Sequence, residues 1–242
     1  MESFTRTERL IGPEALEKLS RARVAVFGVG GVGGYAAEAL ARSGVGALDL
    51  FDNDQVAESN LNRQIIALRS TLGRDKAAVM AERVRDINPQ ASVTPHALFY
   101  LPETADQVDF DAFDYIVDAI DTVTAKLDLI VQAKKRGVPI ISAMGAGNRL
   151  DPTKLRVGDL YETQNCPLAR VMRRELRKRG VPALQVVYST EPALRPAPVS
   201  AEEAPTGRRA TPGSVAFVPS VMGLIMASVV VRQLAGIETP GG

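Results

Sequence analysis

Two features of the 242-residue sequence predict an α/β fold with a mostly parallel sheet flanked by helices. Short apolar runs alternate with helical patterns between residues 22 and 150, and the first apolar run leads directly into a glycine-rich turn. Repeated strand–helix–strand units of this kind pair their strands in parallel and cover the sheet with helices. With 45% of its residues apolar and 24% charged, the chain has the composition of a globular protein with a sizeable core.

The expected elements of the first part follow one another closely along the chain. Buried strands are predicted at the short apolar runs, residues 23–27, 47–51, 91–95, 114–118 and 139–142. Helices are predicted at residues 35–43, 76–88 and 125–135, the second of which ends before Pro89. The regular alternation is typical of a parallel sheet.

The pattern changes after residue 150. A helix with one apolar side is predicted at residues 168–179 and a short strand at 186–190. Glu191–Gly213 holds five of the 15 prolines, which predicts a long mobile loop. Long loops beside a rigid sheet often carry function.

The longest apolar run, residues 215–231, has no ionisable residue over 17 positions. A membrane span needs about 20 apolar residues, and Pro219 and Gly223 interrupt this run before Arg232 ends it. We interpret the run as a helix buried in the core or in a subunit interface, with a membrane anchor as the alternative. Membrane association is therefore not expected.

The charge balance and the cysteine content further restrict the kinds of protein that the sequence can encode. The 29 Lys and Arg residues balance 28 Asp and Glu residues, which argues against binding nucleic acid through the whole surface but permits a local basic patch. Cys166 is the only cysteine, so an internal disulfide and a metal site made of several cysteines are excluded. The charged amino terminus lacks the apolar stretch of a secretory signal, which indicates a cytoplasmic protein.

A nucleotide site is indicated where the strand at residues 23–27 runs into Gly28-Val-Gly-Gly-Val-Gly33. Glycines let the backbone approach phosphates, and the amino end of the next helix offers free N–H groups to an anion. Asp52 ends the second strand 19 residues after Gly33, where a carboxylate can bind ribose hydroxyls. These are features of a Rossmann-like site. The turn alone is commonest in nicotinamide and flavin proteins, and a turn without ligand is the structural alternative.

Charged residues further along indicate a triphosphate. Arg63 and Lys76 supply positive charge, and Asp121 supplies a hard oxygen ligand for Mg²⁺. Attack at an α-phosphorus needs such groups to stabilise the developing charge. Taken singly, Arg63 is explained equally well as a surface cation, Lys76 as a solvated helix residue and Asp121 as a helix cap. Together, in this order, they indicate ATP and Mg²⁺.

Five motifs together resemble the adenylation domain of the ubiquitin-activating-enzyme superfamily, which includes ThiF-type sulfur-carrier adenylyltransferases. The motifs are Gly28–Gly33, Asp52-Asn-Asp54, Ser59–Gln64, Gly73-X-X-Lys76 and Asp118-X-X-Asp121. The resemblance covers about residues 8–150 and implies an adenylation fold with a C-terminal extension. It also implies that the protein activates a carboxylate as an acyl-adenylate.

The same resemblance assigns individual residues. It implies ATP contacts from Gly28, Gly30, Gly31, Gly33, Asp52, Asp54, Ser59, Asn60, Asn62, Arg63, Lys76 and Asp121. It implies catalytic roles for Arg63, Lys76 and Asp121, with Asp121 as the metal ligand. Arg9 matches an arginine that reaches into the neighbouring subunit's ATP site, so a homodimer is expected, whereas an exposed arginine before a helix is the alternative.

The second half resembles the tRNA threonylcarbamoyladenosine dehydratases. The motifs that carry this similarity are Gly145–Thr153, Cys166–Gly180, Val187–Glu191 and Gly213–Pro219. The similarity implies ATP-dependent cyclisation of threonylcarbamoyladenosine in the tRNA anticodon loop, with loss of water. We therefore expect one domain over residues 1–242, in which 1–150 bind the nucleotide and 151–242 bind substrate and the second subunit.

Other functions are weighed against this one. Relatives that activate a sulfur-carrier protein usually hold zinc between two Cys-X-X-Cys pairs, which this sequence lacks. Adenylation of a sulfur-carrier carboxyl terminus is still the main alternative. A nicotinamide-dependent oxidoreductase and a non-catalytic nucleotide-binding partner are the others.

A basic helix supports tRNA as the substrate. On a helical wheel its cations fall within about 140° of arc, opposite the apolar residues. A one-sided row of cations suits a phosphate backbone, although a solvated helix face is the alternative. The predicted tRNA contacts are Arg170, Arg173, Arg174, Arg177 and Lys178.

Cys166 stands where the dehydratase family commonly has aspartate. Three roles are considered for it: a small buried residue, a contact for sulfur transfer from a cysteine desulfurase system, and a nucleophile. The single histidine, His96, lies away from every motif, so a structural or surface role is expected.

Overall fold

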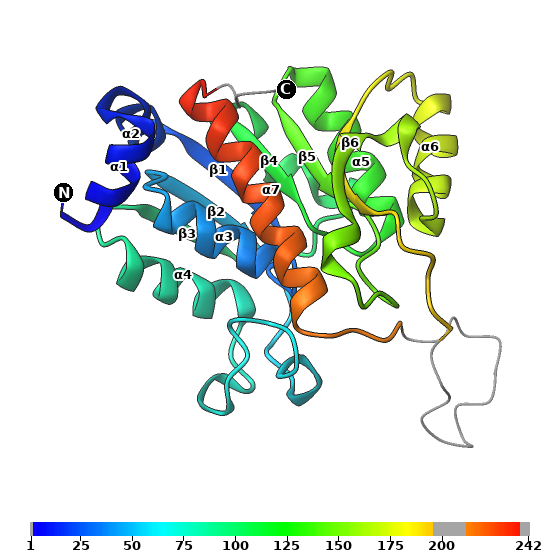
Figure 1. Cartoon of the computed structure of the whole chain (residues 1–242), viewed down its shortest axis with the longest axis horizontal. Helices are drawn as coiled ribbons and strands as arrows, with labels where there is room; N and C mark the ends of the chain where they lie inside the picture. Colours follow the sequence, from blue (N-terminus) through cyan, green and yellow to red (C-terminus); the bar gives the residue numbers. More distant parts are fainter. Residues whose placement is uncertain (1, 196–211, 238–242) are drawn as a thin grey trace.

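The computed structural model describes residues 2–195 and 212–237. Its centre is a seven-stranded sheet covered by helices on both faces (Figure 1). Side chains that alternate along β1 (Arg23–Phe27) enter two separate clusters, with Val24 and Val26 in one and Ala25 and Phe27 in the other. Because strand side chains alternate between faces, the chain has a hydrophobic cluster on each side of the sheet. The predicted fold class is confirmed.

The strand order places a crevice in the middle of the sheet. The order is β3 (Ser92–His96), β2 (Ala47–Phe51), β1, β4 (Tyr115–Asp118), β5 (Ile140–Ala143), β7 (Gln185–Ser189) and β6 (Leu155–Asp159). All neighbours are parallel except β6 and β7, which are antiparallel. The chain runs outward in opposite directions from β1 and β4, and such a point opens a ligand crevice at the carboxyl ends of the strands.

The helices, apart from the first two, lie close to where the sequence predicts them. They are α1 (Thr5–Ile11), α2 (Pro13–Arg21), α3 (Gly33–Arg42), α4 (Lys76–Ile87), α5 (Val123–Arg136), α6 (Pro167–Lys178) and α7 (Phe217–Ala235). α7 extends further than expected because apolar contacts continue beyond the predicted end at residue 231. The loop expected at 191–213 lies mostly outside the described residues.

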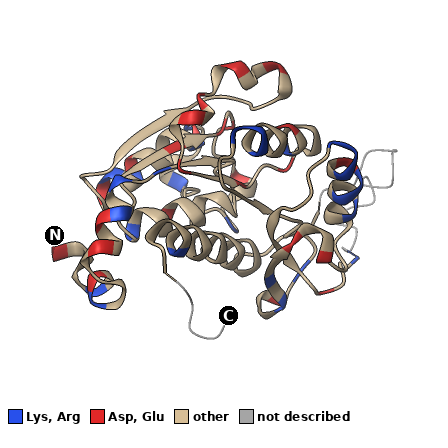
Figure 2. Cartoon of the chain, turned by 90° about the horizontal axis from the view of Figure 1, so that it is seen from above, with Lys and Arg blue, Asp and Glu red and all other residues tan. Residues whose placement is uncertain are grey.

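Three elements are not expected from the sequence. α1 and α2 form in the charged amino-terminal segment, where α2 begins with Pro13 and buries Ala15 and Leu19. β6 is an edge strand in which Arg156 and Val157 are exposed, and it exists by pairing with β7. β6 and α6 lie at the same end of the molecule (Figure 1), where Lys and Arg gather on α6 (Figure 2).

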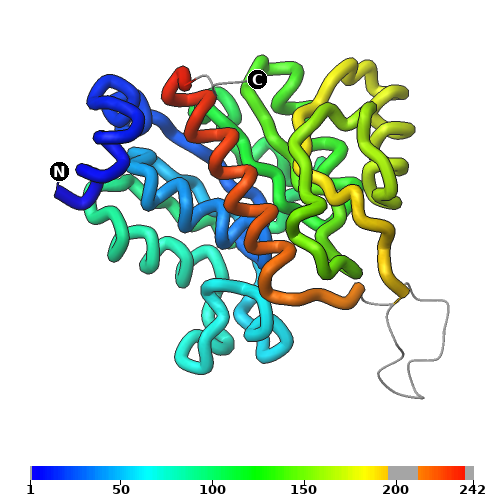
Figure 3. Tube along the Cα trace, viewed as in Figure 1, coloured from blue at the N-terminus to red at the C-terminus, as the bar shows by residue number. Residues whose placement is uncertain are grey.

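α7 packs closely against α3 (Figure 3). A Cβ atom at Gly223 would lie 2.2 Å from the carbonyl oxygen of Val32, so only glycine permits this approach. α7 is long and apolar enough to cross a membrane. Of its most apolar stretch of 18 residues, 44% is buried against the rest of the protein. The buried side fits the expected core helix, whereas Phe217 and Leu224 leave an apolar strip exposed.

The contact at Gly223 gives a stability prediction. Alanine in a helix ordinarily stabilises by about 1 kcal/mol relative to glycine. Gly223→Ala should nevertheless lower the free energy of unfolding by about 1–3 kcal/mol, because the added methyl group overpacks against α3. Urea unfolding measures the change. Ser228→Ala, on the exposed side of α7, is the matched control, and equal effects of the two substitutions would contradict the packing account.

Candidate functional site

A cavity of about 390 Å³ opens at the carboxyl ends of the central strands. The glycine turn after β1, the segment Asp52–Asp54 after β2 and the loop Ala119–Asp121 after β4 line it. The structure brings Arg63 and Lys76 to the same cavity from other parts of the chain. It is therefore the place where the sequence-predicted groups meet.

The four glycines of the turn have two different structural roles. Gly28 has φ +85°, and a Cβ there would lie 2.7 Å from the Ala119 carbonyl oxygen. A Cβ at Gly33 would lie 1.8 Å from the Gly28 carbonyl oxygen, so both positions require glycine. At Gly30 and Gly31, which line the cavity together with Gly28, the nearest atoms to a Cβ would be side-chain atoms at 3.4 Å or more. α3 begins there without a side-chain cap, which leaves its amino end suited to an anion.

Asp52 joins the end of β2 to the glycine turn. Its carboxylate accepts hydrogen bonds from the backbone N–H of Val29 at 2.7 Å and of Asp54 at 2.9 Å. Burial raises the pKa of Asp52, an effect that these two hydrogen bonds only partly oppose. The carboxylate is thus held rigidly at the wall of the cavity.

Lys76 and Arg63, two of the predicted catalytic residues, are held in place by different kinds of contact. Lys76 is buried at the start of α4, and its Nζ lies 2.7 Å from Oδ2 of the exposed Asp54. Arg63 is half-buried and donates to the Ser59 carbonyl and to Oδ1 of Asn62, both at 2.9 Å. Two cations therefore already stand at the cavity wall, held by polar partners.

Asp121 is exposed and lines the cavity. In the described part of the chain, its carboxylate accepts one long hydrogen bond, 3.4 Å from the Thr122 hydroxyl. Residues 2–195 and 212–237 contain no group of three or more His, Cys, Asp or Glu side chains able to hold a metal.

Four other predicted contacts lie outside the cavity lining. Ser59 and Asn62 support Arg63, and Asn62 also donates to the Ser214 carbonyl. Asn60 is buried and accepts from the Ala57 N–H, which shapes the loop. Arg9 is exposed on α1 and does not line the cavity of its own chain. Contacts of these residues with ATP stay predictions.

Gln64 and Tyr100 are among the cavity residues that were not predicted from the sequence. Gln64 is buried, and its Oε1 atom has no hydrogen-bond partner among the described residues. A buried acceptor of this kind calls for a ligand donor, and its place directly after Arg63 was the available signal. Tyr100 also lines the cavity and donates to Asp128 at 2.7 Å, and burial raises its pKa well above the ordinary value.

α6 carries the basic surface expected for tRNA. It buries Met172 and Leu176 and exposes cations on its other side (Figure 2). The sequence predicts a row of five cations that all face tRNA. Arg173 differs, because its guanidinium donates to the Thr163 carbonyl of the same chain at 2.8 Å. Arg177 lies over the ring of Tyr161. The exposed predicted cations are Arg170, Arg174, Arg177 and Lys178.

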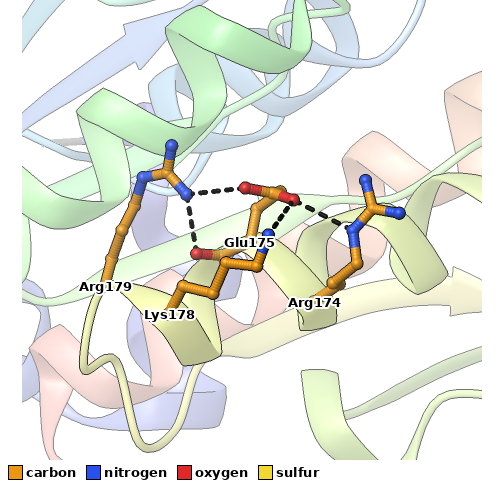
Figure 4. A network of polar contacts seen from close by, with 4 residues as sticks. All are labelled: Arg174, Glu175, Lys178 and Arg179. Atoms are coloured by element: carbon orange, nitrogen blue, oxygen red, sulfur yellow. Dashed lines mark hydrogen bonds and ion pairs between the residues drawn. The ribbon is translucent and has the colours of Figure 1, made fainter.

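Glu175 gathers three cations on this surface (Figure 4). Its carboxylate accepts from Arg179 at 3.0 Å, from Arg174 at 2.9 Å and from Lys178 at 3.3 Å. These hydrogen bonds, that of Arg179 first, lower the pKa of Glu175 to about 2. Glu175 is therefore ionised at neutral pH and offsets part of the positive charge of α6.

The remaining polar candidates have structural contacts. Cys166 is buried at the amino end of α6, where its Sγ accepts from the Ala169 N–H at 3.4 Å. His96 stacks on Phe51 with ring centroids 4.1 Å apart, and its Nε2 lies 2.8 Å from Asp49. These contacts agree with the structural interpretations of both residues.

Comparison with known proteins places the chain in a family. A model of the ThiF family matches residues 4–241. The chain belongs to the ThiF family. A ThiF-family relative from Bacillus subtilis (strain 168), named tRNA threonylcarbamoyladenosine dehydratase, is 44% identical over 97% of this chain and 95% of its own length.

Solved structures and more distant relatives agree with this placement. The crystal structure of Escherichia coli tRNA N6-threonylcarbamoyladenosine dehydratase in complex with ATP is 37% identical, with a TM-score of 0.87 over 97% of this chain and 94% of that chain. The adenylyltransferase and sulfurtransferase uba4 of Aspergillus terreus (strain NIH 2624 / FGSC A1156) is 36% identical, but over 52% of this chain and 26% of its own length.

The raised pKa of Asp52 predicts a pH effect on stability. The folded protein binds the Asp52 proton more tightly than the unfolded chain does, so stability from this group declines as pH rises through the folded pKa. The unfolding free energy of the wild type minus that of Asp52→Asn should fall as pH rises from the unfolded pKa of about 4, and should level off above the folded pKa. Urea unfolding across this range tests the slope, and a difference that grows with pH would contradict it.

Proposed function

We propose that this ThiF-family chain uses ATP to cyclise threonylcarbamoyladenosine in the anticodon loop of tRNA, with loss of water. The observation that carries the proposal is the meeting of Arg63, Lys76 and Asp121 at one cavity beside the glycine turn. The full-length similarity to the B. subtilis dehydratase supports the choice of substrate.

The proposed orientation of ATP follows from the residues that line the cavity. Its phosphates lie against Gly30, Gly31 and the amino end of α3, while its ribose binds Asp52. Arg63 and Lys76 bind the phosphates, and Lys76 exchanges its contact with Asp54 for them. The ATP and AMP complexes of the 37%-identical E. coli enzyme support this assignment.

Asp121 is the residue that would hold Mg²⁺. A carboxylate with one long hydrogen bond is suited to a hard cation, and Mg²⁺ at nucleotide sites is commonly bound by one or two carboxylates together with substrate phosphates. The bound ion would neutralise charge that develops on the phosphates.

The chemistry proceeds in two steps. The threonine carboxylate is ionised at neutral pH, so it attacks the α-phosphorus without a general base, forms the acyl-adenylate and expels pyrophosphate. An atom of the neighbouring carbamoyl group then attacks the activated carbonyl carbon, the bond from that carbon to the AMP oxygen breaks, and the carbamoyl group loses an N–H proton as AMP leaves. Because this nucleophile belongs to the same molecule, positioning by the protein suffices.

The assembly is a cytoplasmic homodimer. Arg9 is exposed on α1, as a residue that reaches into the neighbouring subunit must be. The exposed apolar strip of α7 at Phe217 and Leu224 offers surface for subunit contact. The expectation of a cysteine desulfurase partner depends on Cys166 alone. Cys166 is buried, which weakens this expectation.

Mass measurement of the modified nucleoside tests the function. The protein is incubated with ATP, Mg²⁺ and tRNA from a strain that lacks this activity. Threonylcarbamoyladenosine should lose the mass of one water while ATP becomes AMP and pyrophosphate. Arg63→Ala and Lys76→Ala should each lower the rate by about 10²-fold or more, because each removes charge from the phosphates.

Exposed Lys135→Ala, on α5, is the control and should keep the wild-type rate. Unchanged nucleoside mass would contradict the proposal. Pyrophosphate exchange that needs a sulfur-carrier protein and not tRNA would favour the alternative function.

The Glu175 cluster predicts a gain of tRNA affinity. Glu175→Gln removes the one carboxylate shared by three cations, so tRNA should bind about two- to fivefold more tightly, the effect of one exposed charge. The salt dependence of binding should also steepen. Fluorescence titration without ATP measures both. Glu103→Gln, at an exposed position away from α6, is the control and should change neither the affinity nor its salt dependence. If Glu175→Gln also changes neither, α6 is not the tRNA surface.

A further inference from the structure

The loop that carries Asp121 rests on a charged cluster buried beneath the cavity. Lys126 of α5 and Asp118 at the end of β4 have fully buried side chains, and Nζ lies 2.9 Å from Oδ2. Ser142 of β5 donates its hydroxyl to the same Oδ2 at 2.6 Å. Nothing in the sequence pattern distinguishes Lys126 from the solvated lysines of α5.

The cluster binds the backbone of the loop between β4 and α5. Lys126 donates to the Ile120 carbonyl at 3.1 Å and, more weakly, to the Asp118 carbonyl at 3.5 Å. Oδ1 of Asp118 accepts from the Ile120 N–H at 3.2 Å. Ile120 is therefore held at both its N–H and its carbonyl, by two side chains of opposite charge.

The glycine turn holds the same loop from its other side. The Ala119 N–H donates to the Phe27 carbonyl at 2.8 Å, and Gly28 lies against the Ala119 carbonyl. Asp121 follows directly and makes one long contact of its own. Its position at the cavity is thus set by the backbone that precedes it.

A buried ion pair is a poor means of stabilising a fold. Removing both charges from water costs about as much as their attraction returns, and apolar residues of the same volume often do as well or better. The Lys126–Asp118 pair instead provides two directed contacts to Ile120 in one short loop, and a weaker one to the Asp118 carbonyl just before it. Fixing that loop accounts for the pair better than stability does.

We propose that Lys126 is a positioning residue of the nucleotide site, which fixes the Ala119–Asp121 loop so that Asp121 faces bound ATP and Mg²⁺. The inference rests on the proposed use of ATP, but not on the identity of the carboxylate that is activated. It requires no direct contact between Lys126 and the nucleotide.

Paired substitutions separate positioning from folding. Lys126→Met alone leaves Asp118 charged and unpaired in the interior, and should lower Tm by roughly 10 °C. Two double variants, Lys126→Met with Asp118→Asn and Lys126→Met with Asp118→Leu, remove both charges and should recover most of Tm. The double variant whose Tm is nearer to that of the wild type is used for the binding and turnover measurements. Lys134→Met, exposed on the same helix, is the control.

ATP affinity is measured by calorimetry without tRNA, once with Mg²⁺ and once with EDTA. The double variant should bind ATP like the wild type in EDTA, where the glycine turn and Asp52 suffice. With Mg²⁺ it should bind about tenfold more weakly than the wild type, and its turnover at saturating ATP should fall about 100-fold, the effect of a small misplacement. Lys134→Met should match the wild type throughout.

The outcomes are decisive in both directions. A double variant with wild-type Mg²⁺ dependence and turnover would overturn the positioning role. A wild type whose ATP affinity ignores Mg²⁺ would overturn it as well. If the wild type binds ATP with Mg²⁺ but leaves tRNA unchanged, the proposed substrate fails while the binding data still decide the role of Lys126.

Discussion

The contact between the turn after β1 and the loop after β4 is the constraint on which the site depends. A side chain at Gly28 would collide with the Ala119 carbonyl, so the two loops meet backbone to backbone at the centre of the sheet. That approach leaves Gly30 and Gly31 at the cavity wall and places Asp121 at its edge. The crevice of a doubly wound sheet supplies the space, and this contact gives it its shape.

Charge around the cavity is organised before any ligand binds. Lys76 is paired with Asp54, Arg63 is held by backbone and amide oxygens, and Lys126 is paired with Asp118 beneath the loop. Groups fixed in this way need little rearrangement when charge develops on a phosphate, which is the main advantage of a preorganised site. The basic surface of α6 is organised in a similar manner by Glu175 (Figure 4).

Much of the fold could be predicted because the central parallel strands β1, β2, β4 and β5 are almost entirely buried. The strands at 23–27 and 47–51 lie where their apolar runs predict them. β6 could not be found in this way, since Arg156 and Gly158 give no strand pattern and the strand forms because β7 offers an edge. Among site residues, motif spacing found Arg63, Lys76 and Asp121. It missed Lys126 and the hydrogen bond of Arg173 to Thr163, because both depend on how the chain folds back onto residues eight and ten positions earlier, which no periodic pattern records.

The central claim is that a substrate carboxylate attacks the α-phosphorus of ATP in this cavity. The most direct measurement follows a heavy-oxygen label placed in the threonine carboxylate of threonylcarbamoyladenosine in tRNA. If an acyl-adenylate forms and ring closure releases AMP, one labelled oxygen should appear in the phosphate of AMP. Label released only as water, or found in inorganic phosphate with ADP as the other product, would contradict the account.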